Sequence, residues 1–295
     1  MADSKKPNSN DLLPEEICGE ECHRHDANRR EFGALMLGLG LTAATSSLAK
    51  AAAMAVTETD VTIKTADGTC DAVIIHPASG AHPGVIVWPD AGGLRPIFRD
   101  MGKRLAAEGY TVLVPNPFYR AVKAPLPADF PQDQRPKLRE GLAAAGGAEG
   151  DAKAFIAFLD GHASYRKGAK IGVTGYCMGG PLTMRTAAAF PDRIGAAGSF
   201  HGGGLVTDQP NSPHLLAAKI KAKYAFCVAD NDDQREPEAK NVLREAFVKA
   251  GNPADIEVYK GANHGWCVPS SQVYNHEQAE RAWAKLVALF KTALV

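Results

Sequence analysis

The chain has no excess of charge of either sign, no long apolar run and, beyond residue 55, no Cys-x-x-Cys pair. It carries 33 basic and 33 acidic side chains, so its net charge is zero and nothing indicates binding to nucleic acid. No run is long enough to predict a stable membrane span in the mature chain. The missing Cys-x-x-Cys pair argues against a thiol redox protein. A hydrophobic fraction of 45% is enough for a sizeable core.

The first 55 residues differ from the rest and resemble an export signal. Arg29 and Arg30 precede a mildly apolar stretch, residues 33–48, and alanines at 49, 51, 53 and 55 offer cleavage sites. This order is typical of a twin-arginine signal. We therefore expect residues 1–55 to be removed after the precursor meets the twin-arginine export machinery, which predicts a periplasmic or secreted protein. The alternative is an amphipathic N-terminal helix on a cytoplasmic protein.

The six cysteines fall into two groups. Cys18 and Cys22 lie in the predicted signal beside His23 and His25, and metal binding by this cluster is the less favoured interpretation because the segment would be discarded. Four cysteines remain in the mature chain, namely Cys70, Cys177, Cys227 and Cys267. A disulfide between the last two is one possibility that spacing alone leaves open.

Beyond residue 55, apolar runs alternate with helical patterns. Runs at 61–64 and 70–75 flank the turn Ala66-Asp67-Gly68 and predict an antiparallel hairpin. Residues 116–148 are rich in proline and charge, and we expect this long connection to cover a site. The alternation predicts one α/β domain over 56–295, with a mainly parallel sheet, helices on both faces and the hairpin at one edge. Further strands are expected at 85–88, 110–114, 170–174, 194–200, 222–229 and 255–259, and helices at 98–108, 150–159, 181–189, 237–250 and 278–294.

The segment Gly175-Tyr176-Cys177-Met178-Gly179 lies between a predicted strand and a predicted helix. This is the context of a nucleophile elbow, a tight turn that presents its central side chain at the carboxyl edge of the sheet. Glycines on either side remove Cβ atoms that would clash, and the helix N-terminus stabilises negative charge on a thiolate or an oxyanion. The segment lacks the Gly-Lys-Ser/Thr of a phosphate-binding loop. The alternative is that Cys177 is simply a small buried residue.

Candidate partners for Cys177 follow two later strands. The run Asp230-Asn231-Asp232-Asp233 comes after one of them, and His264 comes after the last. Nucleophile, acid and base therefore occur in the chain order of the α/β-hydrolase fold. His264 is the expected general base. Asp232 is our preferred acid because it lies three residues past the strand end; Asp233 is a close alternative and Asp230 the third.

The same fold predicts an oxyanion hole made of two backbone N–H groups. One belongs to Met178, the residue after the nucleophile. The other is expected from Ala91, in the loop after strand 85–88. Asp90 lies beside it and is a second acid near the thiol, unless it only caps the following helix.

These segments together resemble the dienelactone hydrolase family of the α/β-hydrolase fold. The resemblance spans roughly residues 60–292. It implies hydrolysis of a small-molecule ester or lactone through a Cys-His-Asp triad and a thioester acyl-enzyme, as in a carboxymethylenebutenolidase. It also implies a monomer that needs no cofactor and no metal. The segments that carry it are 175–180, 229–233 and 263–265, with support from 90–93, 115–120, 200–205 and 212–214.

The resemblance also implies roles for residues that line the substrate pocket. The family type has a glutamate that hydrogen-bonds the thiol, where this chain has the shorter Asp90. Two arginines bind the substrate carboxylate in the family type; Arg120 matches one, whereas Val268 stands near the place of the other, which argues against a strict dienelactone specificity. His201 and Trp266 are candidate pocket linings. A non-hydrolytic protein of this fold that binds a small carboxylate is the alternative function.

Overall fold

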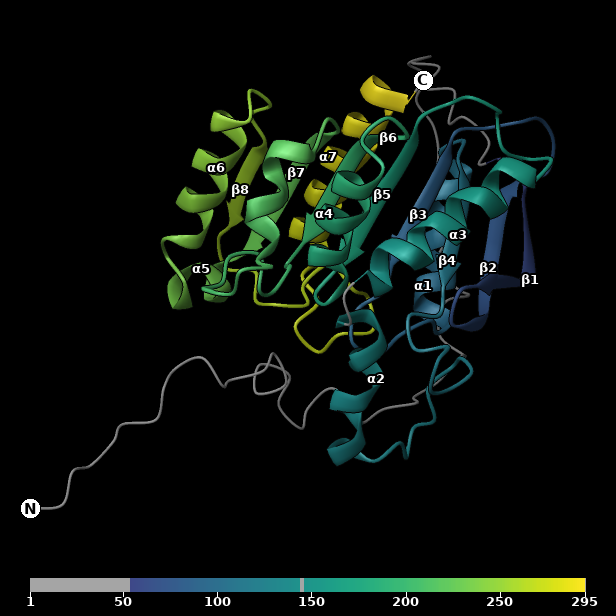
Figure 1. Cartoon of the computed structure of the whole chain (residues 1–295), viewed down its shortest axis with the longest axis horizontal. Coiled ribbons are helices and arrows are strands. Elements are labelled where there is room, and N and C mark those ends of the chain that lie inside the picture. The colour runs from purple at the N-terminus through teal and green to yellow at the C-terminus, as the bar shows by residue number, and fades with distance from the viewer. Residues whose placement is uncertain (1–53, 144–145, 295) are drawn as a thin grey trace, which may run out of the picture.

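The apolar runs form the strands of one open sheet. In the computed structural model, which describes residues 54–143 and 146–294, eight strands pair in the order β1-β2-β4-β3-β5-β6-β7-β8 (Figure 1). Their buried positions are rich in valine and isoleucine, which suit a pleated surface covered on both faces. The strands are β1 (Val56–Thr65), β2 (Gly68–Pro77), β3 (Gly84–Trp88), β4 (Thr111–Pro115), β5 (Ile171–Tyr176), β6 (Ile194–Phe200), β7 (Lys223–Ala229) and β8 (Asp255–Tyr259).

The predicted α/β-hydrolase architecture is confirmed. β1 pairs antiparallel with β2, and β2 pairs antiparallel with β4, whereas all the pairs from β4 to β8 are parallel. The carboxyl ends of β3, β5, β6, β7 and β8 therefore meet at one edge of the sheet, called the carboxyl edge below. The loops at this edge hold every residue that the sequence assigns to the catalytic triad and the oxyanion hole.

Helices cover both faces of the sheet. α1 (Pro96–Ala107) and α7 (His276–Leu294) pack on one face, and α3 (Gly147–Gly161), α4 (Gly179–Ala189) and α6 (Ala239–Lys249) on the other. Figure 1 shows α3 and α4 in front of the sheet and α7 behind it. Each face has its own aromatic core: Phe98 and Phe290 pack on the first, and Phe155 and Phe247 on the second.

Two helices were not predicted from the sequence. α2 (Arg135–Ala143) lies within the proline-rich connection, and its Pro136 falls in the first turn, where a missing N–H removes no helical hydrogen bond. α5 (Asp230–Arg235) is built from the aspartate run, which places negative charge at a helix N-terminus. Figure 1 places α2 beyond the carboxyl edge, on the side of the loops that follow β7 and β8.

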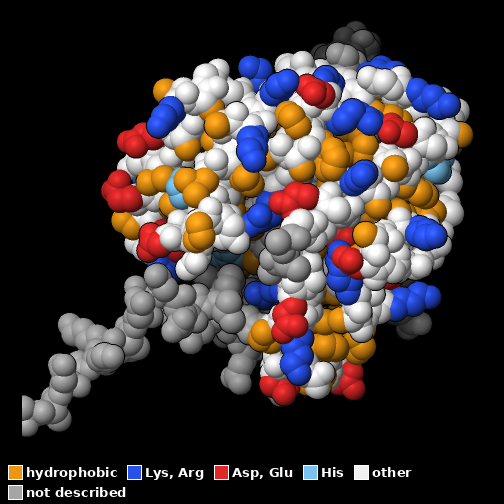
Figure 2. Space-filling model, in the orientation of Figure 1, with side chains coloured by type: hydrophobic (Ala, Val, Ile, Leu, Met, Phe, Trp, Pro, Cys, Tyr) orange, Lys and Arg blue, Asp and Glu red, His pale blue; other side chains and the backbone are white. Residues whose placement is uncertain are grey.

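Almost all of the predicted export segment lies outside the described residues. This applies to Arg29, Arg30 and the cluster of Cys18, Cys22, His23 and His25. Of the described helices, none combines the length and the apolar content that crossing a bilayer requires. Basic and acidic side chains are interspersed over the face of the molecule seen in Figure 2, as expected for a chain of zero net charge.

Candidate active site

Cys177 occupies the apex of the turn between β5 and α4. Its backbone φ is +52°, in the left-handed region that residues other than glycine seldom adopt. The flanking glycines permit this turn: a Cβ on Gly175 would collide with the carbonyl oxygen of Gly179, and one on Gly179 with the carbonyl oxygen of Trp88. The elbow is thus pressed against the end of β3, and the Cys177 side chain remains only slightly exposed.

His264 lies on the loop after β8, where it contacts both Asp232 and Cys177. Its Nδ1 is 2.6 Å from Oδ2 of Asp232, and its backbone N–H donates to Oδ1 of Asn231 at 2.8 Å. The Cys177 side chain forms a hydrogen bond with the same imidazole. These contacts bring together the Cys, Asp and His that the sequence selected from three separate strand ends.

The other two aspartates of the run are paired with lysines. Asp233 accepts from Nζ of Lys240 at 2.6 Å, and Asp230 accepts from Nζ of Lys260 at 3.0 Å. Asp230 also accepts from the backbone N–H of Gly261, which ties the loop after β8 to the start of α5. Asp232 is the member of the run whose carboxylate reaches the imidazole.

The surroundings of His264 favour its charged form. Burial lowers the pKa of this imidazole, but hydrogen bonds to Asp232 and Cys177, with the negative charge of both partners, raise it to about 10. The His264 side chain is 7% exposed, so water screens these interactions little. The ring is therefore a strong acceptor for the thiol proton.

His201 and Trp266, both expected to line the pocket, lie buried next to His264. The ring centroid of His201 is 4.9 Å from that of His264 and 5.3 Å from that of Trp266, in edge-to-face contacts. Trp266 also stacks on Tyr259 at 5.1 Å. Burial and the neighbouring His264 hold the pKa of His201 well below its usual range, so this second imidazole is neutral.

The expected oxyanion donors are available. Within residues 54–143 and 146–294, neither the backbone N–H of Met178 nor that of Ala91 donates to another group. The Gly179 backbone lies against the carbonyl groups of Trp88 and Pro89, which brings the elbow next to the loop that carries Ala91. Two free N–H groups beside a nucleophile can stabilise a tetrahedral oxyanion.

Comparison with known proteins identifies the family of the chain. The model of the dienelactone hydrolase family matches residues 70–294. The chain belongs to this family. It is 32% identical over 219 residues to Protein usf of Aquifex pyrophilus, covering 72% of this chain and 89% of that protein. It is 26% identical over 234 residues to the carboxymethylenebutenolidase of Rhodococcus opacus, covering 77% and 88%. The chain is therefore an ester or lactone hydrolase.

Solved structures share the fold. A dienelactone hydrolase-like promiscuous phosphotriesterase from metagenomic libraries superposes with a TM-score of 0.69 at 21% identity, covering 82% of this chain and all of the other. The dienelactone hydrolase of Anabaena variabilis gives a TM-score of 0.57 at 16% identity, covering 81% and 99%. At these identities the likeness establishes the fold alone.

Asp90 of this hydrolase stabilises its own loop. Its Oδ1 accepts from the backbone N–H of Gly92 at 2.8 Å, and its Oδ2 accepts from Nη2 of Arg95 at 2.8 Å. These two hydrogen bonds stabilise the turn that leads into α1. These contacts hold the carboxylate within its own loop, but α1 begins after Arg95 without a side-chain cap, so Asp90 does not cap the helix as the sequence alternative suggested.

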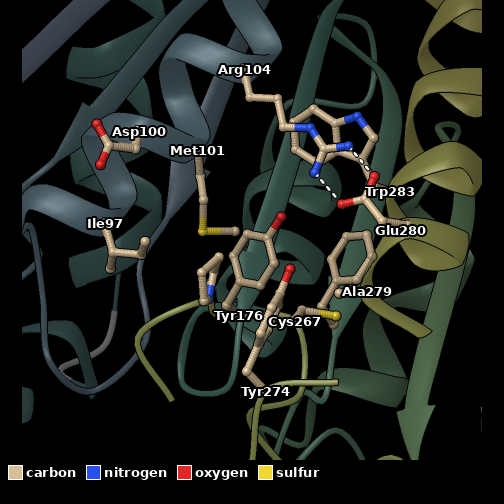
Figure 3. Close-up of a pocket in the computed structure, with 12 residues that line it drawn as sticks. Ile97, Asp100, Met101, Arg104, Tyr176, Cys267, Tyr274, Ala279, Glu280 and Trp283 are labelled. Atoms are coloured by element: carbon tan, nitrogen blue, oxygen red, sulfur yellow. Dashed lines mark hydrogen bonds and ion pairs between the residues drawn. The ribbon is translucent and has the colours of Figure 1, made fainter. Parts of the chain in front are cut away.

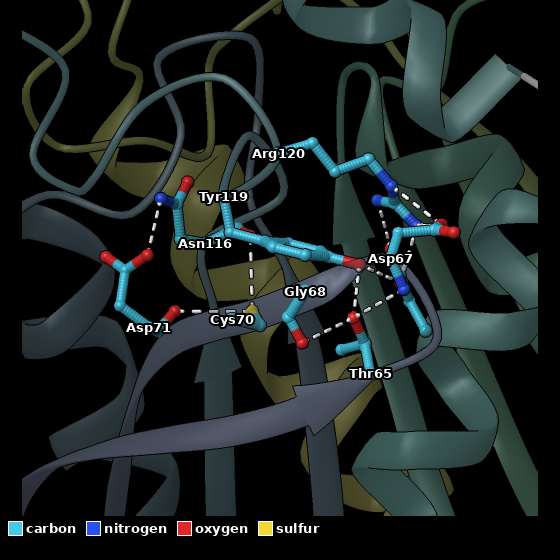
Figure 4. A network of polar contacts seen from close by, with 9 residues as sticks. Thr65, Asp67, Gly68, Cys70, Asp71, Asn116, Tyr119 and Arg120 are labelled. Carbon is cyan, nitrogen blue, oxygen red and sulfur yellow. Dashed lines mark hydrogen bonds and ion pairs between the residues drawn. The ribbon is translucent and has the colours of Figure 1, made fainter.

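Arg120, expected to bind a substrate carboxylate, is engaged by two carboxylates of the protein, those of Asp67, labelled in Figure 4, and Asp151. Its Nη1 and Nη2 donate to Asp151 at 2.8 Å each, and its Nε donates to Asp67 at 2.9 Å. The guanidinium also lies over the Tyr119 ring. The side chain of Asp151 is 2% exposed, so this is a buried pair rather than a solvated one. Val268, which stands near the place expected for the second arginine of the family type, is buried.

All four described cysteines are free and buried, so Cys227 and Cys267 do not form a disulfide. Burial raises the pKa of the Cys227 thiol to about 12 and raises that of Cys267 well above its usual range. Burial likewise raises the pKa of Cys70. These three thiols resist ionisation, whereas Cys177 has an imidazole to receive its proton.

A cavity of about 170 Å³ lies beside the site, between α1 and α7 (Figure 3). Met101, Tyr176, Cys267 and Trp283 contribute to its wall, and the ion pair of Arg104 with Glu280 closes one side. None of the three triad candidates lines it. Among the residues that the structure describes, no three or more His, Cys, Asp and Glu side chains are grouped to hold a metal ion.

Proposed function

We propose that the chain hydrolyses small, uncharged carboxylic esters or lactones through Cys177, His264 and Asp232. The observation that carries the proposal is one imidazole in contact with both partners: Nδ1 lies 2.6 Å from Asp232, and the ring also hydrogen-bonds the thiol. A nucleophile bonded to a base that a third group orients is the geometry that activates a weak nucleophile.

The first half of the reaction forms a thioester. His264 accepts the thiol proton, and the thiolate of Cys177 attacks the carbonyl carbon of the substrate. The oxyanion that develops accepts hydrogen bonds from the N–H groups of Met178 and Ala91. Collapse of the tetrahedral intermediate breaks the bond to the alkoxy oxygen, which leaves with the proton held by His264. For a lactone, both products stay in one molecule.

The second half releases the acid. His264, now neutral, accepts a proton from a water molecule that attacks the thioester carbonyl. The same N–H groups stabilise the second oxyanion, and the thiolate leaves and regains its proton. Asp232 keeps the proton of the imidazole on Nδ1 and stabilises the charged ring in both halves. The carboxylic acid is the product, and no group outside this chain except water is consumed.

The charge around the site supports an uncharged substrate. The guanidinium of Arg120 is neutralised by Asp151 and Asp67, and an apolar residue, Val268, takes the place of a second arginine. A guanidinium already bidentate to a buried carboxylate offers little to another one. The same contacts disfavour the alternative of a carboxylate-binding protein without hydrolysis.

The N-terminal segment supports export of the enzyme precursor. We propose that residues 1–55 carry the precursor through the twin-arginine route and are then removed, leaving residues 56–295 as a periplasmic or secreted monomer. The order of arginine pair, apolar stretch and small residues supports this proposal. Replacing both Arg29 and Arg30 by Lys should retain the enzyme in the cytoplasmic fraction. Unchanged fractionation would favour the cytoplasmic alternative.

The hydrolytic proposal is tested with purified protein and p-nitrophenyl acetate. Cys177→Ala and His264→Ala should each abolish turnover. Cys267→Ala is the matched control, since that residue is also 8% exposed but is not among the groups that raise the pKa of His264, and it should retain turnover. A dienelactone, which carries a carboxylate, should be hydrolysed less efficiently than the neutral ester. Full turnover by Cys177→Ala would refute the thiol mechanism.

A further inference from the structure

The backbone of His201 is held in a strained conformation. It follows β6 with φ +39°, in the left-handed region, and Gly202, Gly203 and Gly204 come directly after it. A glycine at this position would adopt such a conformation without cost. A non-glycine residue that keeps a left-handed conformation in a site is held there by its surroundings, and the strain points to a use for its side chain.

The His201 ring accepts a hydrogen bond from the backbone of the nucleophile, Cys177. Its Nδ1 accepts from the N–H of Cys177 at 3.1 Å, and this N–H is shared with the carbonyl oxygen of Phe200 at 3.0 Å. The backbone N–H of His201 donates to the carbonyl oxygen of Cys227 at 2.8 Å, which fixes the residue to the end of β7. His201 therefore links the elbow on β5 to the strand that leads to Asp232.

The tautomer of His201 follows from these contacts. An Nδ1 that accepts carries no proton, so the neutral ring has its proton on Nε2. Among the described residues, Nε2 has no hydrogen-bond partner. The ring is therefore held by the hydrogen bond that Nδ1 accepts from the N–H of Cys177. Protonation of Nδ1 would break that contact and place a second positive ring 4.9 Å from the centroid of His264. Both burial and the repulsion oppose it.

We propose that His201 is a positioning residue for the nucleophile. Its Nδ1 holds the peptide group before Cys177, so that Sγ is directed toward His264 while the Met178 N–H faces the forming oxyanion. This inference rests on the proposed function, because it assigns His201 a part in the same reaction. It differs from a pocket lining, since the contact is with the enzyme's backbone and not with substrate.

Three substitutions of His201 distinguish the effect of its hydrogen-bond acceptor from the effects of its side-chain volume and of its backbone strain. His201→Asn keeps an acceptor, since its Oδ1 can take the place of Nδ1, and Asn tolerates the left-handed backbone. His201→Leu keeps side-chain bulk but has no acceptor. His201→Gly relieves the strain and also has no acceptor, and it supplies a folded comparison if the Leu variant is unstable. The same changes at His82, before β3 and so at the opposite edge of the sheet, are the matched control.

Two rates are measured for each full-length variant. The first is alkylation of Cys177 by iodoacetamide as a function of pH, followed by mass spectrometry of its peptide. The second is kcat and KM for p-nitrophenyl acetate. Misplacement of a reacting group by about 1 Å can cost about 100-fold in rate. We expect losses of 10- to 100-fold in alkylation and kcat for the Leu and Gly variants, with little change in KM, and a rate at least about 10-fold higher for the Asn variant.

The outcomes are distinct. Equal rates for the Asn, Leu and Gly variants, fast or slow, would overturn the inference, because the acceptor would then have no effect. A slow Gly variant that is as stable to heat as the wild type would exclude a merely structural role. If Cys177→Ala still turned over ester, the proposed function would fail, yet the alkylation rates would still report whether His201 positions the thiol.

Discussion

Replacing Asp232 by Asn removes one charge from the site and preserves its shape. Burial lowers the pKa of His264, yet the hydrogen bonds to Asp232 and Cys177 raise it from 6.5 to about 10. One pKa unit is about 1.4 kcal/mol, so the two partners, after the opposing effect of burial, favour the charged ring by a net of about 5 kcal/mol. If each supplies about half, the loss of the carboxylate costs about 2–3 kcal/mol, or about 100-fold in the fraction of thiol that has passed its proton to the ring.

The assay is the rate of iodoacetamide alkylation at pH 7, with esterase turnover measured in parallel. Asp233→Asn is the control, because that neighbouring carboxylate pairs with Lys240 instead of the imidazole. We expect about a 100-fold lower rate for Asp232→Asn and a change below about 3-fold for Asp233→Asn. The reverse order, or equal small effects, would refute the assignment of Asp232 as the acid of the triad.

Three further predictions concern stability. Because the pKa of His264 is raised in the folded state, the stability that this group contributes is complete below pH 6.5 and is lost as pH rises through 10. The free energy of unfolding in urea should therefore decrease more between pH 6 and pH 10 for the wild type than for His264→Gln. Gly179→Ala should lower the free energy of unfolding by about 1–3 kcal/mol, because the added Cβ would meet backbone atoms. Gly150→Ala, in α3 with open space around it, should raise the free energy of unfolding by about 0.5–1 kcal/mol. Equal effects of the two substitutions in denaturant unfolding would contradict this packing. Asp151→Asn should cost about 3–5 kcal/mol, because it removes the buried carboxylate that faces the Arg120 guanidinium and leaves only the exposed Asp67 as its charged partner. Asp67→Asn, whose carboxylate is 54% exposed, should cost about 0–1 kcal/mol by the same measurement, and a large effect at this exposed site would contradict the assignment of the stabilising charge to the buried pair.

The strands and most helices could be predicted because their signals are local. The run at 194–200 consists of apolar residues and glycines except for Ser199 and coincides with β6, and the hairpin turn Ala66-Asp67-Gly68 connects β1 and β2 as expected. Buried parallel strands are short apolar runs bounded by turn residues, and this chain places Pro or Gly at most of those boundaries. The order of the strand ends then located Cys177, His264 and the aspartate run without any three-dimensional information.

The remaining features depend on contacts that one sequence does not reveal. Asp232 and Asp233 could not be separated because α5 was not predicted, and successive side chains on a helix point about 100° apart. Arg120 was assigned from its place in a loop, but its partner Asp151 belongs to α3. His201 was assigned to the pocket, and only the three glycines after it hinted at an unusual backbone.

The order of the strands also bears on how the site comes into being. Cys177, His201, Asp232 and His264 follow β5, β6, β7 and β8, four adjacent strands that are also consecutive in the chain. Synthesis from the N-terminus delivers the nucleophile first and its base last, shortly before α7 completes one face of the sheet. A chain synthesised only through α5 holds Cys177 and Asp232 but not yet the imidazole of His264. The thiol therefore gains its imidazole partner only after β8 and the loop that follows it have been made.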